Sequence, residues 1–199
     1  MLTECLGVPH ISTGDMLRES MRTAHLDERA VAKMQSGGLV RDEVINEMVA
    51  ERLARADAAK GFILDGYPRT IDQAEHLTTW LDGRGVQGVV IHLAVDYNII
   101  IARLTGRRQC PRCGTLYNVA SHPPKRAGFC DLDGETLAIR DDDREDVIRE
   151  RLDAYDRQTK PVLEFFGKSR HRVVNVETGD ESPEAVYQKI RREMMEPAS

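Results

Sequence analysis

Two pairs of metal-binding residue types within one short stretch constrain the fold most strongly. The chain carries Cys110-Pro-Arg-Cys113 and, after sixteen intervening residues, Cys130-Asp-Leu-Asp133. Two close pairs of thiolate or carboxylate ligands, separated by a loop, are what one tetrahedral zinc ion requires, and aspartate is an accepted zinc ligand. The sequence therefore predicts a Cys3Asp zinc site that cross-links the loop of roughly residues 109 to 138. Two chance pairs of this spacing in a loop are the alternative.

Composition excludes several other classes of protein. The chain has 199 residues, of which 41% are hydrophobic and 31% charged, as is usual for one globular domain with an insertion or for two small domains. No apolar run approaches the ~20 residues of a membrane span. The N-terminal residues MLTECLGVPHIS lack the basic start and apolar core of a signal peptide. We therefore expect a cytoplasmic protein with no membrane partner.

The cysteines and the net charge narrow the possible partners. Only Cys5 lies outside the proposed metal site, which fits a reducing compartment better than a disulfide framework. The formal net charge of −5 argues against nucleic acid as a partner, because phosphate backbones require a basic face. The arginines are therefore expected to serve a small anionic ligand.

Predicted strands and helices alternate along the chain. Apolar runs typical of strands lie at residues 8–11, 62–64, 89–93 and 172–176, those at 62–64 and 89–93 being expected as buried strands. One helix is expected to begin at the capping segment 12–15, and further helical patterns cover 26–35, 42–56, 71–81, 96–104, 142–160 and 183–194. Pro161 is expected to kink the helix over 142–160 at its end or to start a new turn. This alternation predicts βα units and a parallel sheet, which binds ligands at the carboxyl ends of its strands.

Two segments carry residue types that suit a phosphate. In Ser12-Thr13-Gly14-Asp15-Met16-Leu17-Arg18, free N–H groups, a hydroxyl and a guanidinium can converge on an anion, although such a helix start is by itself usually only a cap. In Asp65-Gly66-Tyr67-Pro68-Arg69-Thr70, a carboxylate at a strand end precedes a rigid turn that projects an arginine, and a plain strand-to-helix turn is the alternative.

Further arginines flank the predicted metal loop. Arg103 and Arg107 are four residues apart and are predicted to share one helical face, while Arg140 and Arg151 follow the loop. Any one of them alone is best interpreted as a solvated surface charge. The Arg107-Arg108 pair next to Cys110 suggests that the stapled loop closes over an anion.

Taken together, these segments resemble the adenylate kinase family, in its long form with a zinc-binding lid. The motifs ISTGDMLR, DGYPRT-x-x-Q, LTGRRQCPRCGTLY, HPPK and IRDDDREDVIRERL occur in the family's order and approximate spacing, from about Gly7 to Ile190. The resemblance implies an α/β fold with a P-loop-kinase-like parallel sheet flanked by helices and a small zinc-stapled lid. It also implies a monomer that transfers a phosphoryl group from ATP to AMP, giving two ADP, with magnesium as cofactor, in nucleotide salvage and energy homeostasis.

The resemblance further implies a division of the chain into domains. The core takes residues 1–11, 42–105 and 144–199, the AMP-binding domain takes 12–41, and the zinc-binding lid takes 106–143. The zinc is expected to be structural, because the lid is too small to own a hydrophobic core.

Site residues follow from the same resemblance, residue by residue. Those matching the AMP site are Thr13, Arg18, Gly38, Leu39, Val40, Gly66, Tyr67, Pro68, Arg69, Gln73, Arg140 and Arg151. Those matching the ATP side are Arg103, Arg107, Leu116 and Tyr117, and those matching catalytic positions are Arg107, Arg140, Arg151 and Asp65, the last of which organises water around magnesium. Gln73 is the adenine-reading position, since an amide both donates and accepts. Ser121 departs from the family, which often has an aromatic there, so we expect weaker adenine stacking.

One family motif does not occur in the printed sequence. No G-x-x-x-x-G-K-[ST] loop is present, and the resemblance places that loop and the central first strand before Met1. We expect that the printed chain starts at an internal methionine; a fragment, or a paralogue that lost catalysis and kept AMP binding, are the alternatives. As written, the chain is expected to be a poor kinase with a sheet that lacks its central strand.

An alternative hypothesis from a different class of protein is a zinc-ribbon module that binds nucleic acid or protein. The metal quartet by itself permits it, whereas the acidic balance and the ISTGDMLR and DGYPRT segments oppose it.

Overall fold

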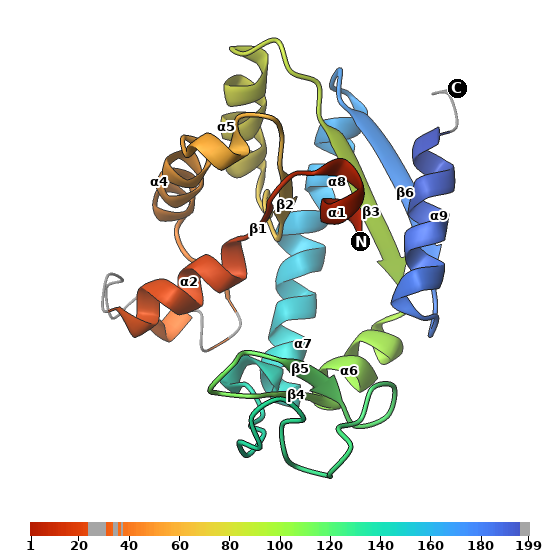
Figure 1. Cartoon of the computed structure of the whole chain (residues 1–199). Coiled ribbons are helices and arrows are strands. Elements are labelled where there is room, and N and C mark those ends of the chain that lie inside the picture. The colour runs from red at the N-terminus through yellow and green to blue at the C-terminus, as the bar shows by residue number, and fades with distance from the viewer. Residues whose placement is uncertain (24–30, 34–35, 37, 196–199) are drawn as a thin grey trace.

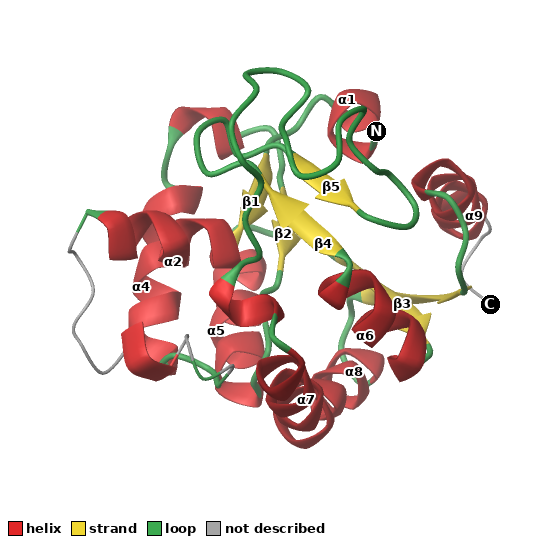
Figure 2. Cartoon of the chain, turned by 90° about the horizontal axis from the view of Figure 1, so that it is seen from below, coloured by secondary structure: helices red, strands yellow, loops and turns green. Residues whose placement is uncertain are grey.

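The computed structural model describes residues 1–23, 31–33, 36 and 38–195. Parallel strands lie in the middle of the molecule and helices surround them, while a small lobe carrying β4 and β5 projects at one end (Figures 1 and 2). The strands are β1 (His10–Ser12), β2 (Ile63–Asp65), β3 (Val89–Val95), β4 (Arg107–Gln109), β5 (Leu116–Asn118) and β6 (Arg172–Thr178). The helices are α1 (Leu2–Leu6), α2 (Thr13–Arg22), α4 (Asp42–Leu53), η1 (Ala56–Ala58), α5 (Ile71–Asp82), α6 (Tyr97–Thr105), η2 (Asp141–Asp143), α7 (Glu145–Ala154), η3 (Tyr155–Thr159), α8 (Lys160–Gly167) and α9 (Pro183–Met195).

The parallel strands form two separate pairs. β1 pairs with β2 and β3 pairs with β6, both in parallel, with Ile11 opposite Leu64 and Ile91 opposite Val174. Within the described residues no ladder joins β2 to β3. The α/β fold with parallel strands flanked by helices is confirmed, and in the described residues these strands form two pairs rather than one continuous sheet.

The prediction that the strands at residues 62–64 and 89–93 are buried is wrong, because no residue of either segment is fully buried. In β3, Val89 is 47% exposed and Leu93 is 44% exposed. A parallel strand is buried on both faces only where other elements cover both of them. The apolar runs therefore predicted the strands correctly but not how far their side chains are buried.

The main hydrophobic core joins the β1–β2 pair to α4, α5 and α8. α4 buries Ile45, Val49 and Leu53 at a helical spacing of four residues, which forms one apolar face. Each such side chain stabilises the fold by about 1.5–3 kcal/mol when fully buried. Other members of the core are Ile11, Val40, Ala58, Tyr67, Ala74, Leu77, Leu81, Val162 and Phe166. These contacts fix the strand ends from which the site is built.

The helix predicted over residues 142–160 is interrupted at both ends. Asp141–Asp143 forms a 3-10 turn, α7 starts at Glu145, and a π-helical segment, Tyr155–Thr159, precedes α8. Pro161 lies in the first turn of α8, where its missing N–H breaks the regular hydrogen-bond series. The Thr159 hydroxyl, at the end of the π segment, donates to the carbonyl of Arg69 (3.0 Å), so this interruption contacts the turn after β2.

Two further helix predictions are not confirmed. Arg103 and Arg107 do not share a helical face, because α6 ends at Thr105 and Arg107 starts β4. The helix expected over residues 26–35 falls largely outside the described residues.

Across the described part of the chain, no helix combines the length and the apolar character needed to span a membrane.

Candidate active site and metal site

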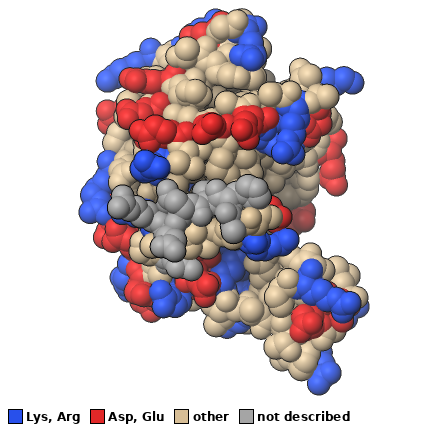
Figure 3. Space-filling view, turned by 90° about the vertical axis from the view of Figure 1, so that its left-hand side faces the viewer, with Lys and Arg blue, Asp and Glu red and all other residues tan. Residues whose placement is uncertain are grey.

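A cavity opens at the carboxyl ends of β1 and β2. Its described lining residues are Thr13, Gly14, Leu17, Arg18, Gly38, Leu39, Val40, Ile45, Gly66, Arg69, Gln73, Asp142 and Arg151. Figure 3 shows Lys and Arg side chains in the hollow between the main body and the projecting lobe. Nine residues expected at the AMP site thus line one cavity, whereas Tyr67, Pro68 and Arg140 are not among its lining residues.

The start of α2 forms as its sequence predicts. The Ser12 hydroxyl accepts a hydrogen bond from the Asp15 N–H (3.3 Å), which caps the helix. The Thr13 hydroxyl donates to the carbonyl of Gly66 (2.9 Å) and ties α2 to the turn after β2. One turn into the helix, Arg18 Nη2 donates to Asp15 Oδ1 (2.6 Å), and this bond lowers the pKa of Asp15. The guanidinium is thereby held at the cavity.

The turn after β2 requires glycine at position 66. Gly66 has φ +74°, in the left-handed region. A Cβ there would lie 2.8 Å from Arg69 Nη2 and 3.1 Å from the Thr13 hydroxyl, so a side chain would displace both. Arg69 Nε donates to the Gly66 carbonyl (2.8 Å), which aims the guanidinium into the cavity. Burial lowers the pKa of Arg69, and repulsion from Arg151 and Arg18 lowers it further.

Gln73 is buried beneath this turn and is 2% exposed. Its Oε1 accepts a hydrogen bond from the Arg69 N–H (2.8 Å), and its Nε2 donates to Asp42 Oδ1 (2.7 Å). An amide nitrogen carries two hydrogens, so Gln73 keeps one donor for a ligand. The Tyr67 hydroxyl donates to Asn46 Oδ1 (2.7 Å), and burial raises the pKa of Tyr67. Tyr67 therefore supports the turn from the core.

Gln73→Leu is expected to have two separable effects. Loss of the amide leaves Asp42 Oδ1 and the Arg69 N–H without their partner, which costs about 1–3 kcal/mol of unfolding free energy for a buried group. Loss of the remaining donor relaxes the preference for adenine over other bases in nucleoside monophosphate binding. Urea unfolding measures the first effect and competitive titration with AMP, GMP and CMP measures the second. An unaltered base preference would remove Gln73 from the base-reading role.

Arginines from the lobe side have polar partners of their own. Arg140 Nε donates to Gln109 Oε1 (2.7 Å), and burial lowers the pKa of Arg140. Arg103 Nη2 donates to the carbonyl of Gly179 (2.8 Å), which fixes it against the loop after β6. Arg140 is close enough to Arg18 and Arg107 for their charges to lower its pKa further, whereas Arg103 is held by the segment after β6.

Consecutive aspartates beside these arginines were not anticipated as site residues. The Asp143 side chain is 0% exposed, and Arg107 Nε lies 3.5 Å from its Oδ2. Within the described structure neither Asp143 oxygen has a hydrogen-bond partner, and burial raises the pKa of Asp143. Asp142 lines the cavity. The acidic run that directly follows Arg140 was the available sequence signal.

Asp65 ends β2, as predicted, and is exposed. His10 Nε2 lies 3.1 Å from Asp65 Oδ2, across the β1–β2 pair. This histidine was not anticipated, since only the parallel pairing of the two strands brings it beside Asp65.

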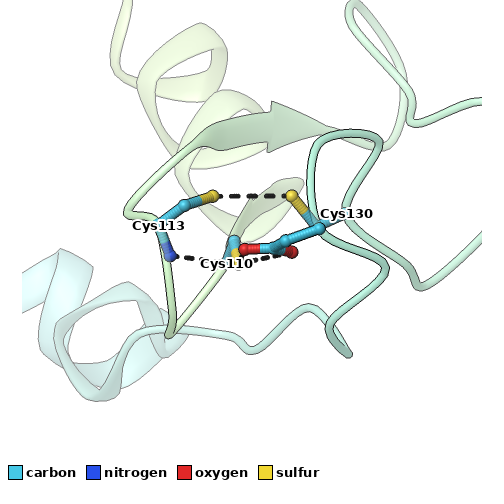
Figure 4. Close-up of side chains that lie close together, drawn as sticks. Cys110, Cys113 and Cys130 are labelled. Atoms are coloured by element: carbon cyan, nitrogen blue, oxygen red, sulfur yellow. Dashed lines mark hydrogen bonds between the residues drawn. The ribbon is translucent and has the colours of Figure 1, made fainter.

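The four residues predicted to bind a metal come together in the lobe as predicted. Ligand atoms of Cys110, Cys113, Cys130 and Asp133 all lie within 4.8 Å of one another. Figure 4 shows the Cys113 and Cys130 sulfurs facing each other, 3.5 Å apart, and Cys110 Sγ lies 3.4 Å from an Asp133 oxygen. A tetrahedral ion with ~2.3 Å bonds to sulfur separates its sulfurs by about 3.8 Å. The donor set and its spacing therefore fit one metal ion.

Two similar turns present these ligands. The Gly114 N–H donates to the Cys110 carbonyl (3.0 Å) and the Gly134 N–H donates to the Cys130 carbonyl (2.9 Å). Both glycines have positive φ, +77° and +73°, which suits residues without a Cβ. Each pair of ligands is thus followed by a glycine that closes its turn.

The protonation of the ligands differs across the cluster. Hydrogen bonding, chiefly from the Glu135 N–H, lowers the pKa of Asp133 to about 2. Hydrogen bonding with Thr115 lowers the pKa of Cys113, whereas burial raises that of Cys110 to about 11. A bound cation favours the thiolate form of every cysteine ligand.

Tyr117 belongs to the interior of the lobe. It is 4% exposed, and its hydroxyl lies 3.5 Å from Cys130 Sγ and accepts a hydrogen bond from the Asp131 N–H (2.8 Å). Leu116, its neighbour in β5, is 47% exposed. Of these two residues expected on the ATP side, the structure buries one beside the metal ligands and exposes the other.

The fold and the cavity define a parallel α/β protein with an arginine-lined site suited to a phosphorylated ligand. A sequence model of the adenylate kinase family matches residues 1–171. A relative named adenylate kinase from Anaeromyxobacter dehalogenans is 43% identical over 94% of this chain and 87% of its own length. Adenylate kinases from Listeria monocytogenes (46% identical over 84% of this chain and 79% of the relative) and Thermoanaerobacter sp. strain X514 (41% over 93% and 85%) agree. The chain belongs to the adenylate kinase family, a family of phosphotransferases, and the resemblance expected from its motifs is confirmed.

Proposed function

We propose that this chain transfers the γ-phosphoryl group of ATP to AMP, giving two ADP. The observation that carries the proposal is the convergence of Arg18, Arg69 and Arg151, from three separate elements, on one cavity at the strand ends. In the reaction an oxygen of the AMP phosphate bonds to the γ-phosphorus of ATP, and the bond from that phosphorus to the β–γ bridging oxygen breaks, releasing ADP. Such transfers depend on in-line positioning and charge stabilisation more than on covalent participation by the protein.

On the AMP side, the guanidiniums of Arg18, Arg69 and Arg151 are proposed to neutralise the phosphate. The free amide hydrogen of Gln73 is proposed to donate to the adenine. Leu39 and Val40, from the chain between α2 and α4, supply apolar surface for the base. Because the acceptor phosphate is held between the strand ends and α7, its oxygens are kept in one orientation for attack.

On the ATP side, Arg103, Arg107 and Arg140 are proposed to contact the donor nucleotide and the phosphoryl group in transfer. Arg107 and Arg140 lie at the boundary with the lobe, so its approach would bring their charges to the phosphates and exclude water. Bound magnesium supplies charge neutralisation at the phosphates, and Asp65 is proposed to orient its water ligands.

The domain division expected from the sequence is retained as a proposal: core 1–11, 42–105 and 144–199, AMP-binding domain 12–41, and lid 106–143. The lobe is supported as a separate unit by its own small buried cluster, which consists of Cys110, Tyr117 and Cys130 with Leu137 packed against it. We propose that its metal is structural zinc, because four protein ligands leave no open position for chemistry.

A cytoplasmic, monomeric protein is proposed as well. None of the four cysteines, all of which lie in the described residues, forms a disulfide, as is usual in a reducing compartment. Gel filtration with light scattering at micromolar concentration measures the oligomeric state.

A coupled assay of ADP formation from ATP and AMP tests the proposal, together with calorimetric titration of each nucleotide. The printed sequence contains no G-x-x-x-x-G-K-[ST] loop, and this observation favours a second candidate function, AMP binding with little turnover. We expect the 199-residue chain to bind AMP and form ADP slowly. Turnover at a rate usual for adenylate kinases would eliminate the second candidate, and failure to bind AMP would contradict both.

A further inference from the structure

One carboxylate lies among the arginines of the cavity. Asp142 Oδ2 is 3.5 Å from Arg151 Nη1 and 3.7 Å from Arg18 Nη1, and its side chain is 17% exposed. Arg151 belongs to α7 and Arg18 to α2, so Asp142 bridges two elements that both contribute to the cavity lining. Arg151 Nη1 also donates to the Asp142 carbonyl (3.3 Å).

The two ion pairs are longer than tight hydrogen bonds. Charge-assisted N–H···O bonds measure about 2.7–2.9 Å. Arg18 makes its short bond, of 2.6 Å, to Asp15, which does not line the cavity. The carboxylate of Asp142 therefore attracts both guanidiniums without a short hydrogen bond to either, and an incoming anion can replace it without breaking the bond between Arg18 and Asp15.

The cationic charge in the cavity requires a counter-ion. Among the described lining residues are the guanidiniums of Arg18, Arg69 and Arg151 and one carboxylate, that of Asp142. Repulsion from Arg151 and Arg18 contributes to the lowered pKa of Arg69, so these charges are close enough to oppose one another. A phosphate monoester, with a charge of about −1.5 to −2 at neutral pH, neutralises the same arginines when it is bound.

We propose that Asp142 is a positioning residue that takes the place of the substrate phosphate while the cavity is empty. It holds Arg18 of α2 and Arg151 of α7 toward each other, and it yields both guanidiniums to the phosphate of AMP. The inference rests on the proposed assignment of this cavity to AMP. Asp142 thereby keeps the two arginines aligned in the absence of substrate. Its carboxylate also competes with the substrate phosphate for the same two guanidiniums.

Asp142→Asn tests the competition, because it removes the charge and preserves the shape. Calorimetric titration is made with AMP and with adenosine, which has no phosphate to compete. We expect the Kd for AMP to fall about threefold to tenfold, as for the loss of a partly screened charge contact, and the Kd for adenosine to stay unchanged. The matched control is Asp141→Asn, which removes the same charge from the neighbouring, exposed residue and should alter neither Kd.

The outcomes separate this inference from the proposed function. If wild-type chain binds AMP and Asp142→Asn binds it equally or more weakly, Asp142 does not compete with phosphate and the inference is wrong. Equal weakening of AMP and adenosine binding would show a purely structural role and would also overturn it. If wild-type chain does not bind AMP, the assignment of the cavity and this inference both fail.

A second measurement needs no substitution. Carboxyl ¹³C NMR of the unaltered chain follows the Asp142 Cγ resonance during titration. We expect this resonance to shift on addition of AMP and to stay in place with adenosine, because only the phosphate takes over Arg18 and Arg151. An Asp142 resonance that does not respond to AMP in a chain that binds it would overturn the proposal independently of how the variant folds.

Discussion

Cys113→Ser is expected to abolish stoichiometric metal binding and to unfold the lobe. The variant replaces a thiolate that lies 3.5 Å from Cys130 Sγ and leaves three ligands. Structural zinc contributes about 10–16 kcal/mol of apparent free energy in small domains, where binding and folding are coupled. The lobe has only a small buried cluster of its own to replace that contribution. Metal analysis should give close to one ion per wild-type chain and far less per variant chain.

Thermal unfolding gives the second readout for the metal. At this chain length each 1 kcal/mol changes the Tm by about 2–4 °C, so we expect a loss of at least about 5 °C in the variant and in chelator-treated wild type. Cys5→Ser is the matched control, because Cys5 is an exposed cysteine outside the cluster. AMP affinity should change less than about twofold, since every described residue of the cavity lining except Asp142, at the end of the lid segment 106–143, lies outside the lobe. Wild-type chain purified without chelators that carries far less than one ion would contradict the assignment.

Arg69→Ala is expected to weaken AMP binding about tenfold to 150-fold, corresponding to the roughly 1.5–3 kcal/mol of a hydrogen bond to a charged group. The Arg69 guanidinium lines the cavity and is aimed by its bond to the Gly66 carbonyl, so no other side chain in the turn replaces it. ATP affinity should change much less, because the proposed donor side is formed by Arg103, Arg107 and Arg140. Calorimetric titration of both nucleotides measures the difference.

The control for Arg69→Ala is Arg149→Ala. Arg149 is 64% exposed on α7 and pairs with Glu145, so its removal takes away one positive charge at a distance from the cavity lining. We expect Arg149→Ala to leave both affinities unchanged. Equal losses of AMP and ATP affinity in Arg69→Ala would count against the assignment of the turn to the acceptor nucleotide.

Cys113→Ser and Arg69→Ala affect separate parts of the molecule, the lobe and the cavity. The metal residues lie within one short segment that closes on itself through paired turns, so their effect is expected on the lobe. The arginines of the cavity come from α2, the turn after β2 and α7, so their effect is expected on ligand binding. A variant of one part that changed the readout of the other would show that the lobe and the cavity are coupled.

The sequence by itself determined those features that depend on neighbouring residues. The Ser12 cap fixed the start of α2, and the apolar spacing of α5 gave Ile71–Asp82 to within one residue of the expected end. The spacing of Cys110, Cys113, Cys130 and Asp133 predicted a cluster that the structure brings together. In each case the determining interaction is local, because capping, helical periodicity and short-range ligand spacing act within a few residues or one loop.

Only the tertiary structure decided which groups face one another across the molecule. The pairing of Asp142 with Arg18, the burial of Asp143 beside Arg107, and the exposure of β3 could not be taken from local patterns. The same residue type in the same kind of segment has opposite environments here, since Asp141 is exposed and Asp143 is buried. Burial and charge pairing depend on which distant elements pack together, and the free energy of those contacts is set by the whole fold rather than by sequence neighbours.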